Sequence, residues 1–411
     1  MNRSPLIVIF TTVFIDLVGF GIVIPVLPFY AEGTAFNATP RTVGLLFASY
    51  SVMQLIFSPI LGGLSDKHGR RLVLLLSIIG TGIGFLILGL AKTVVMLFIG
   101  RILDGITGGN ISTAQAYIAD VTTEENRAKG MGLIGAAFGL GFIFGPAIGG
   151  ILSRWGIHVP FFFAATLCFA NATLLYFTLP ETVTADHPAK HSAGGGRNLR
   201  HIVASLKQPR LASVLIIYFL FIVAFSIMTS TFSLYTMFRF GYDAQHTGYL
   251  FAYVGIIAVI IQGGLIGRLV KRFGELPLVI FGALCFAISL FAVPFVGPAA
   301  GGLGALLIGG GVFSMGNSLA TPALTSLASK SVGPEKQGVI LGVTQSTASL
   351  ARAVGPSLTA LLISSSIAHF GADGVAHYMS DHSLFVTFWT GSGIMLLASM
   401  IAAYVLTTDV H

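Results

Sequence analysis

Apolar residues run along this chain in long uninterrupted stretches, separated by short polar intervals. Twelve stretches of about 20 to 30 residues can be marked off, at 5–30, 41–65, 72–91, 94–119, 131–153, 159–179, 210–236, 247–268, 276–296, 299–328, 337–365 and 382–407. A helix needs roughly 20 apolar residues to cross a bilayer. The pattern therefore predicts twelve membrane-spanning helices and no separate soluble domain. The first stretch, from Pro5, is interpreted as a retained helix rather than a cleaved signal peptide.

Composition points the same way. Hydrophobic residues make up 55% of the chain and charged residues only 9%, with a mean hydropathy of +0.89. Soluble domains carry about 25% charged residues. Because this chain has too little polar surface to cover a globule, we expect an integral membrane protein.

The net charge of +7 raises the alternative of a nucleic-acid partner, but its distribution opposes it. With the N-terminus inside, the cytoplasmic intervals hold sixteen of the 22 Lys and Arg residues and the outer intervals hold four. This is the positive-inside bias of membrane proteins. It predicts a bacterial inner (plasma) membrane protein with both termini in the cytoplasm and no nucleic-acid partner.

One long polar interval divides the chain into an N-terminal six-helix bundle (1–180), a cytoplasmic linker (181–209) and a C-terminal six-helix bundle (210–411). Two pieces of the first bundle recur in the second. The spacing of Gly62 to Gly69 is repeated from Gly267 to Gly274, and Gly145-Pro146 is repeated by Gly355-Pro356. Two like halves predict a pseudo-two-fold axis along the membrane normal, with a binding site between the halves near the midplane.

A charged loop separates the second and third stretches. It contains Gly62, Asp66, Gly69, Arg70 and Arg71. Because such dense charge must lie outside the bilayer, the flanking helices are predicted to be an antiparallel pair. Asp66 would be favourably placed at a helix N-terminus, where the macrodipole attracts an anion.

Four ionisable residues lie well inside the predicted helices: Asp16, Arg101, Asp104 and Arg352. Such residues are costly in a membrane and usually functional. Arg101 and Asp104 are three residues apart and share a helix face, so they could simply neutralise each other, which would leave Asp16 without a partner. Arg352 could contact a substrate or anchor its helix.

The fifth stretch is rich in small residues, with Gly141, Gly145, Pro146, Gly149 and Gly150 near its end. Small residues let helix backbones approach closely in lipid, and ordinary packing explains most such glycines.

Over nearly the whole chain these features resemble the major facilitator superfamily, and within it the drug/proton antiporter branch that includes the tetracycline exporters. The matching stretches are Asp16 to Pro28, Gln54 to Leu76, Gly100 to Gly109, Ala119-Asp120, Gly132 to Gly150 and Pro180-Glu181-Thr182. With the twelve stretches and the repeat, the resemblance predicts an all-α integral membrane fold of twelve transmembrane helices in two pseudo-symmetric six-helix bundles, with helices 1, 4, 7 and 10 lining a central cavity.

The resemblance also implies roles for single residues. Arg101 is associated with proton coupling, and the segment from Gly141 to Gly150 with export. Asp66 is expected to meet the start of helix 11 near Gln337, and Arg70 to pair with Asp120. These last contacts would hold the halves together at the cytoplasmic side.

We therefore predict proton-coupled efflux of a hydrophobic or amphipathic small molecule by a monomer, with Asp16 as the proton carrier beside Arg101 and Asp104. The expected cavity residues share aromatic or neutral hydrogen-bonding character, apart from Arg352: Tyr50, Gln54, Asn110, Gln115, Phe138, Phe142, Thr229, Gln262, Asn317, Gln345 and Arg352. A tetracycline-type drug is possible, although Gly84 and Ala258 stand where tetracycline exporters carry an acid and a histidine. The alternatives are an importer of a polar metabolite, proton-symporting or facilitative, and a non-transporting membrane sensor or assembly factor.

Other chemistry finds little support. The histidines match no zinc spacing, and Gly108-Gly109 lacks the strand and lysine of a phosphate loop. Cys168 and Cys285 read as small apolar residues. We expect no enzyme activity, metal or cofactor.

Overall fold

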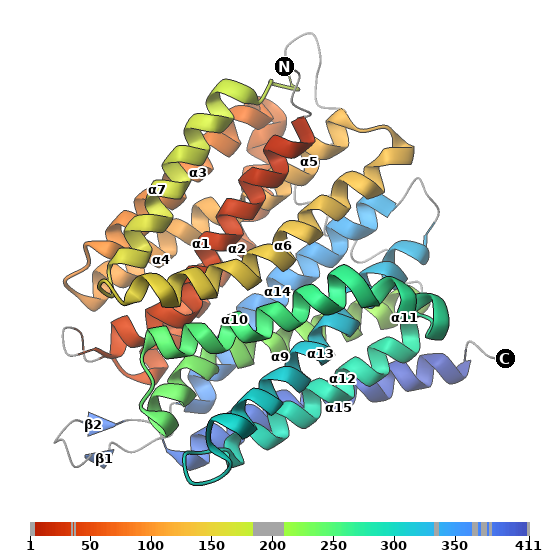
Figure 1. The fold of residues 1–411 in the computed structure, drawn as a ribbon. Coiled ribbons are helices and arrows are strands. Elements are labelled where there is room, and N and C mark those ends of the chain that lie inside the picture. The colour runs from red at the N-terminus through yellow and green to blue at the C-terminus, as the bar shows by residue number, and fades with distance from the viewer. Residues whose placement is uncertain are drawn as a thin grey trace.

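The computed structural model describes residues 5–33, 36, 38–183, 209–332, 337–363, 369–370, 376–377 and 380–408. Long helices dominate this part of the chain (Figure 1). Those of the first half are α1 (Pro5–Glu32), α2 (Pro40–His68), α3 (Arg70–Gly89), α4 (Val94–Thr107), α5 (Ile111–Val121), α6 (Glu124–Ser153) and α7 (Val159–Thr178). Those of the second half are α9 (Pro209–Phe240), α10 (Ala244–Ile260), α11 (Ile266–Phe273), α12 (Glu275–Ala292), α13 (Gly302–Lys330), α14 (Gln337–Ile363) and α15 (Asp381–Thr408).

The helices form two bundles. In the first, α1 packs against α6 and α7, and α3 packs against α4 and α7. In the second, α12 packs against α13 and α15, and α9 packs against α14 and α15. The bundles meet chiefly along two helix pairs, α2 with α14 and α6 with α10. The predicted two-bundle architecture is confirmed, whereas most of the predicted linker 181–209 lies outside the described residues.

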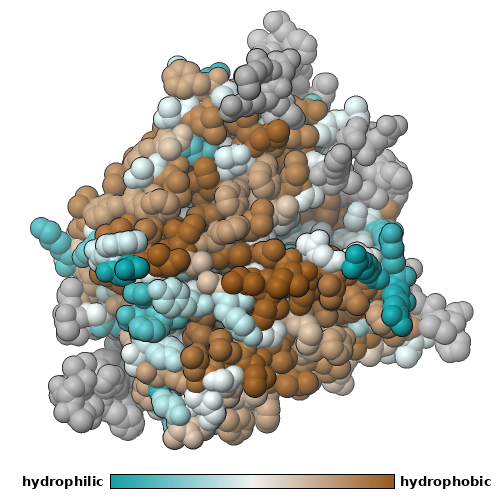
Figure 2. Space-filling model, viewed as in Figure 1, coloured by the Kyte–Doolittle hydropathy of each residue, from teal (hydrophilic) through white to brown (hydrophobic). Residues whose placement is uncertain are grey.

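Eleven of the described helical segments are long and apolar enough to cross a membrane, by length and composition. The remaining predicted span, 337–365, forms α14, which is not among the eleven. Its polar residues explain the difference, because Gln345 and Arg352 face the interior of the protein rather than lipid. Figure 2 shows apolar side chains across the middle of the visible surface, with hydrophilic ones gathered toward its ends.

Two of the predicted spans are interrupted and a third ends in a 3-10 turn, which the apolar pattern did not reveal. A 3-10 turn at Gly108–Asn110 separates α4 from α5, and another at Val293–Phe295 follows α12. A π-helical turn at Ile261–Leu265 separates α10 from α11. Such turns often mark functional sites, and two of these lie beside residues predicted to line the cavity, Asn110 and Gln262.

We name the two ends of the molecule by their residues. The basic end holds the loop around Asp66 to Arg71, the end of α5 and the end of α11, and α1 begins and α15 ends there (Figure 1). The far end holds the turns after α1, α3 and α9. Two short strands also lie there, β1 (His369–Phe370) and β2 (Ala376–His377), paired antiparallel.

The bundles touch closely in their far halves. A Cβ atom on Gly150 of α6 would lie 2.4 Å from Gly248 Cα of α10, and one on Gly44 of α2 would lie 2.9 Å from Ala360 Cα of α14. The Ser233 hydroxyl donates to the Ile24 carbonyl across the same interface, at 3.3 Å.

Toward the basic end the same helices separate. Added Cβ atoms on Gly132 and Gly135 of α6, or on Gly263 and Gly264 of the facing π-helical turn, would meet nothing within 4 Å. The structure is therefore closed at the far end and open toward the basic end.

This difference predicts the effect of a single added side chain. Gly248→Val should force the far halves of α6 and α10 apart, because Gly150 leaves no space for a Cβ atom. In a variant with Cys168 and Cys285 replaced by Ser, a cysteine at Phe251 should then react several-fold faster with a membrane-impermeant thiol reagent added on the far side. Gly304→Val, where nothing lies within 4 Å, is the matched control. Equal labelling of both variants would contradict the packing argument.

Candidate transport site

Three ionisable residues predicted for proton coupling come together inside the first bundle. Arg101 Nη1 lies 2.7 Å from Asp104 Oδ2, and both side chains are almost completely buried. Asp16 of α1 is 8% exposed and lies close enough to Asn110 and Asp104 to interact with both. Asp16, Arg101 and Asp104 are called the coupling cluster below: Asp104 pairs with the Arg101 guanidinium, and Asp16 is a second carboxylate near Asp104.

The residues around the cluster leave it little freedom. The Arg101 guanidinium carbon lies 4.2 Å from the centre of the Tyr50 ring, a cation–π contact. Gln54 Nε2 donates to the Tyr50 hydroxyl and to the Gly108 carbonyl, each at 2.9 Å. A Cβ atom on Gly105 would lie 2.4 Å from the Tyr50 carbonyl oxygen, so this glycine lets α4 meet α2.

Gly84 explains one departure from the tetracycline exporters. A Cβ atom at this position would lie 3.2 Å from Asp104 Cβ and 3.1 Å from the Gly100 carbonyl oxygen. An acidic side chain would therefore need α3 and α4 to move apart. Ala258, at the expected histidine position, lines the cavity described below.

The glycines toward the end of α6 pack closely against α1, the helix that carries Asp16. Added Cβ atoms on Gly141 and Gly145 would lie 2.5 Å from Leu17 Cβ and 2.6 Å from Gly21 Cα. Gly149 makes a similar contact with the Ile22 carbonyl oxygen, 2.8 Å from its added Cβ atom. In the described structure these residues are packing residues. Of the two others predicted with them, Gly150 touches the second bundle and Pro146 lines the cavity.

A cavity of about 500 Å³ lies between the bundles and reaches toward the basic end. Its volume falls in the usual range for small-molecule sites, roughly 300–1,000 Å³. Eight of the eleven predicted cavity residues line it: Gln115, Phe138, Phe142, Thr229, Gln262, Asn317, Gln345 and Arg352. The other three, Tyr50, Gln54 and Asn110, lie in the polar network of the coupling cluster.

The lining comes from eight of the predicted spans. The predicted helices 1, 4, 7 and 10, observed as α1, α5, α9 and α13, all contribute. Residues of α2, α6, α10 and α14 also line the cavity, as the predicted residues Phe138 and Gln345 led us to expect for α6 and α14. Residues missed from the sequence include Phe20, Phe225 and Phe313, which carry no polar group to distinguish them from other apolar helix residues.

A chain of aromatic contacts joins the coupling cluster to the cavity. The Tyr50 ring lies 5.1 Å from that of Phe20, measured between centroids, and Phe20 lies 5.6 Å from Phe142. Phe142 contacts Phe225 at 5.5 Å, and Phe225 stacks on Phe313 at 6.1 Å. Aromatic pairs at these separations attract one another. One contact path therefore runs from the first bundle into the second.

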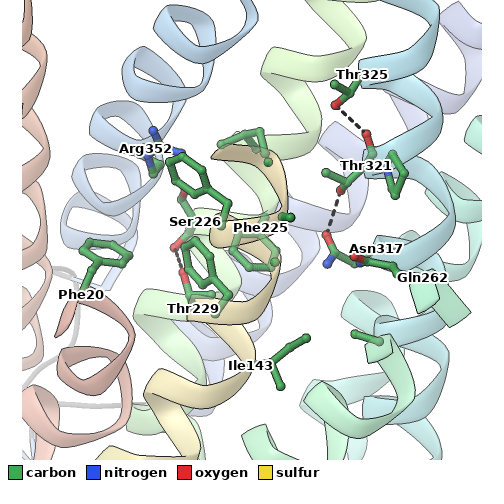
Figure 3. Close-up of a pocket in the computed structure, with 18 of the residues that line it drawn as sticks. Phe20, Ile143, Phe225, Ser226, Thr229, Gln262, Asn317, Thr321, Thr325 and Arg352 are labelled. Carbon is green, nitrogen blue, oxygen red and sulfur yellow. Dashed lines mark hydrogen bonds between the residues drawn. The ribbon is translucent and has the colours of Figure 1, made fainter. Parts of the chain in front are cut away.

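Polar groups lie on two sides of the cavity (Figure 3). On α13, the Thr321 hydroxyl donates to Asn317 Oδ1 at 3.2 Å and the Thr325 hydroxyl donates to the Thr321 carbonyl at 3.0 Å. On α14, Arg352 Nη2 donates to the Ser349 hydroxyl at 3.2 Å, and the guanidinium lies 5.3 Å from the centre of the Phe138 ring.

The charged loop at the basic end forms a second cluster. Arg70 is completely buried and pairs with Asp66, and its Nε donates to Asp120 Oδ2 at 3.0 Å, as expected from the sequence. Ser65 accepts a further bond from Arg70 at 2.7 Å. The expected contact of Asp66 with helix 11 near Gln337 falls on a side chain outside the described ones.

Glu181 completes this cluster, in a role that the sequence did not reveal. Its carboxylate accepts hydrogen bonds from the backbone N–H groups of Arg70 (2.8 Å) and Arg71 (3.0 Å), at the start of α3. A carboxylate is favoured at a helix N-terminus. Gly69 has φ +102°, and its added Cβ atom would lie 2.4 Å from Glu181 Oε2, so both its backbone and its surroundings require glycine.

The two remaining loop residues act locally. Arg71 donates to the Tyr176 carbonyl and lies over the Tyr176 ring, away from the Asp66 cluster. The Gly62 carbonyl accepts from the Ser65 hydroxyl at 2.7 Å, which positions Ser65 for Arg70.

Comparison with known proteins adds independent information. Residues 9–356 match the family model of the Major Facilitator Superfamily. Tetracycline resistance protein, class H, of Pasteurella multocida is 32% identical over 385 residues, which cover 92% of this chain and 93% of that protein. Multidrug resistance protein 2 of Bacillus subtilis (strain 168) is 31% identical over 365 residues, covering 88% and 89%.

A solved structure agrees on the fold. The crystal structure of the human organic anion transporter MFSD10 (TETRAN) has a TM-score of 0.69 and 24% identity, and the alignment covers 98% of this chain and 99% of that one. At this identity the likeness shows the fold alone. Together with the match over residues 9–356, it leads to one conclusion: this chain is an integral membrane transporter that belongs to the major facilitator superfamily.

Proposed function

We propose that this protein exports drug-like small molecules in exchange for protons, by alternating access, in a bacterial inner membrane. The observation that carries the proposal is the coupling cluster beside a cavity of small-molecule size. The tetracycline and multidrug resistance proteins among its relatives support export. Because the cavity is built within one chain, we take the transporting unit to be a monomer.

Charge balance explains how the cluster would carry a proton. The cluster contains two carboxylates, Asp16 and Asp104, and one guanidinium, Arg101, so the ionised cluster has one negative charge in excess. An uncompensated charge is costly away from water. One proton removes the excess, and Arg101 and Asp104 remain paired when it binds. Asp16 is the carboxylate without an ion pair among the described residues, so we assign the proton to it.

We assign the basic end to the cytoplasm, and the positive-inside bias supports this assignment. The structure then corresponds to a cavity that is open to the cytoplasm and closed to the outside, the state in which an exporter takes up its substrate. Export requires a second state in which the inner halves of α6 and the α10–α11 pair close and the contacts around Gly150 and Gly248 open.

The aromatic chain offers a route for coupling. A substrate bound against Phe20 and Phe142 would press on the ring contacts that lead to Tyr50, which covers Arg101. Moving Tyr50 changes how well the guanidinium is stabilised, and hence how strongly the cluster holds its proton. Substrate and proton would thereby influence each other's binding, as linkage requires.

The lining narrows the substrate to amphipathic compounds. It combines aromatic rings with neutral hydrogen-bonding groups such as Asn317 and Gln262, and none of the described lining residues is acidic. A tetracycline–metal cation would therefore meet no carboxylate among these residues, and a side chain in place of Gly84 would be crowded by Asp104 and the Gly100 carbonyl.

Asp16→Asn tests the proton site. The neutral side chain cannot exchange a proton, so uptake of a fluorescent drug into inside-out vesicles, driven by a pH gradient, should fall to the level of vesicles that lack the protein. Asp381→Asn, at an exposed acid at the far end, is the matched control and should transport normally. Undiminished proton-driven uptake by Asp16→Asn, at equal protein in the membrane, would place the coupling site elsewhere.

Asp66→Ala tests the proposed gate at the basic end. If Asp66 stabilises the state closed to the cytoplasm, its removal should increase labelling of a cysteine at Leu341, which lines the inner part of the cavity on α14. Lys67→Ala removes a neighbouring exposed charge and should leave labelling unchanged. Equal labelling of both variants would show that Asp66 has no role as a gate and that the loop is only structural.

A further inference from the structure

Arg352 is the one charged residue that lines the cavity, among the residues that the structure describes. It lies near the middle of α14, where the helix borders the space between the two bundles. Figure 3 shows Arg352 on the opposite side of the cavity from Asn317, Thr321 and Thr325 of α13. A cation at this depth is costly and calls for a partner.

No carboxylate of the described residues pairs with it. Their ion pairs do not include Arg352, and the titratable groups found to interact with it are the phenols of Tyr218 and Tyr50. Its one hydrogen bond among these residues goes to Ser349, which engages Nη2. Arg101 differs, since it is sealed from solvent and paired with Asp104.

Neighbouring groups form, with Arg352, part of a binding site for a ligand. The Gln345 Nε2 atom, two turns away on the same face of α14, is buried without a hydrogen-bond partner in the described structure. Both α14 groups are donors, and Phe138, Phe142 and Phe225 supply aromatic surface beside them. A ligand that fits these groups would carry a negatively charged hydrogen-bond acceptor on an apolar body.

We propose that the preferred substrate is an amphipathic organic anion, an aromatic carboxylate of drug size, whose acid group pairs with the Arg352 guanidinium. Guanidinium and carboxylate form strong, often bidentate hydrogen bonds. The aromatic part would lie on the phenylalanine cluster, and Gln345 would bind a polar substituent. This inference rests on the proposed transport function, whose substrate class it specifies.

The proposal has an energetic consequence for transport. Exporting a monovalent anion while one proton enters moves two charges across the membrane in the favourable direction, whereas exporting a neutral compound moves one. Each charge contributes about 2.3 kcal/mol per 100 mV. Export of the carboxylate should therefore depend more steeply on membrane potential than export of an uncharged analogue.

A matched pair of probes tests the site directly. Binding of 1-naphthaleneacetate and of uncharged 1-naphthaleneacetamide to the purified full-length protein can be measured by calorimetry. We expect the unmodified protein to prefer the carboxylate by about tenfold, a difference of ~1.4 kcal/mol. Arg352→Gln should abolish this preference, because carboxylate binding should weaken about tenfold more than amide binding, and Arg352→Lys should restore part of it. Arg272→Gln, at an exposed cation of α11, is the control and should keep the preference.

Two results would overturn the proposal. The first is that the unmodified protein shows no preference for the carboxylate. The second is that Arg352→Gln weakens the binding of both probes equally, in which case Arg352 only anchors its helix. Two further results distinguish a failure of this substrate proposal from a failure of the proposed transport function. Proton-driven export of neutral drugs without any anion preference would reject the substrate class alone. Arg352-dependent anion binding without proton-driven transport would reject proton coupling and retain the site.

Discussion

The constraint that organises this protein is that a charge placed inside a membrane must be stabilised by its surroundings. Arg101 is completely buried, and Asp104 and the face of Tyr50 stabilise it. The Asp104 contact is formed within α4, because the two residues are three positions apart. The Tyr50 contact requires close helix packing, and Gly105 lets α4 approach α2, which carries Tyr50. A small residue thus allows an aromatic partner to reach a cation that would otherwise destabilise the fold.

The same constraint separates two kinds of buried arginine. Arg101 has its partners within the first bundle and is buried away from the cavity, so it can act as a fixed charge in proton coupling. Arg352 faces the cavity, where water or a bound molecule can stabilise it. Removing one partner from a buried ion pair costs more than the pair contributes when intact. Substitutions of Asp104 should therefore destabilise the folded protein, whereas substitutions of Arg352 should mainly weaken substrate binding.

Much of the architecture could be predicted from the sequence, because length and apolar composition alone determine which segments can cross a bilayer. The two bundles and the pairing of Arg70 with Asp120 follow from repeats and motifs. The breaks at Gly108–Asn110 and Ile261–Leu265 could not be predicted, since an apolar stretch looks the same whether its helix is continuous or contains a 3-10 or π-helical turn. The aromatic lining was missed for a similar reason: Phe20 and Phe225 resemble lipid-facing residues until the bundles are placed together.

The assignment of Tyr50, Gln54 and Asn110 also needed the structure. Their polar character marked them as cavity residues, yet their hydrogen bonds and ring contacts serve the coupling cluster. Sequence shows which helices carry polar groups, but not whether a group faces the cavity or a neighbouring helix.

The central claim is that Asp16 carries an exchangeable proton within the cluster. Infrared difference spectroscopy on the purified protein, stepped between acidic and alkaline buffer, measures it directly through the carbonyl stretch of a protonated carboxylic acid. The account predicts a band that shifts in heavy water, is present in the unmodified protein and is missing from Asp16→Asn. The same band at full intensity in Asp16→Asn would contradict it.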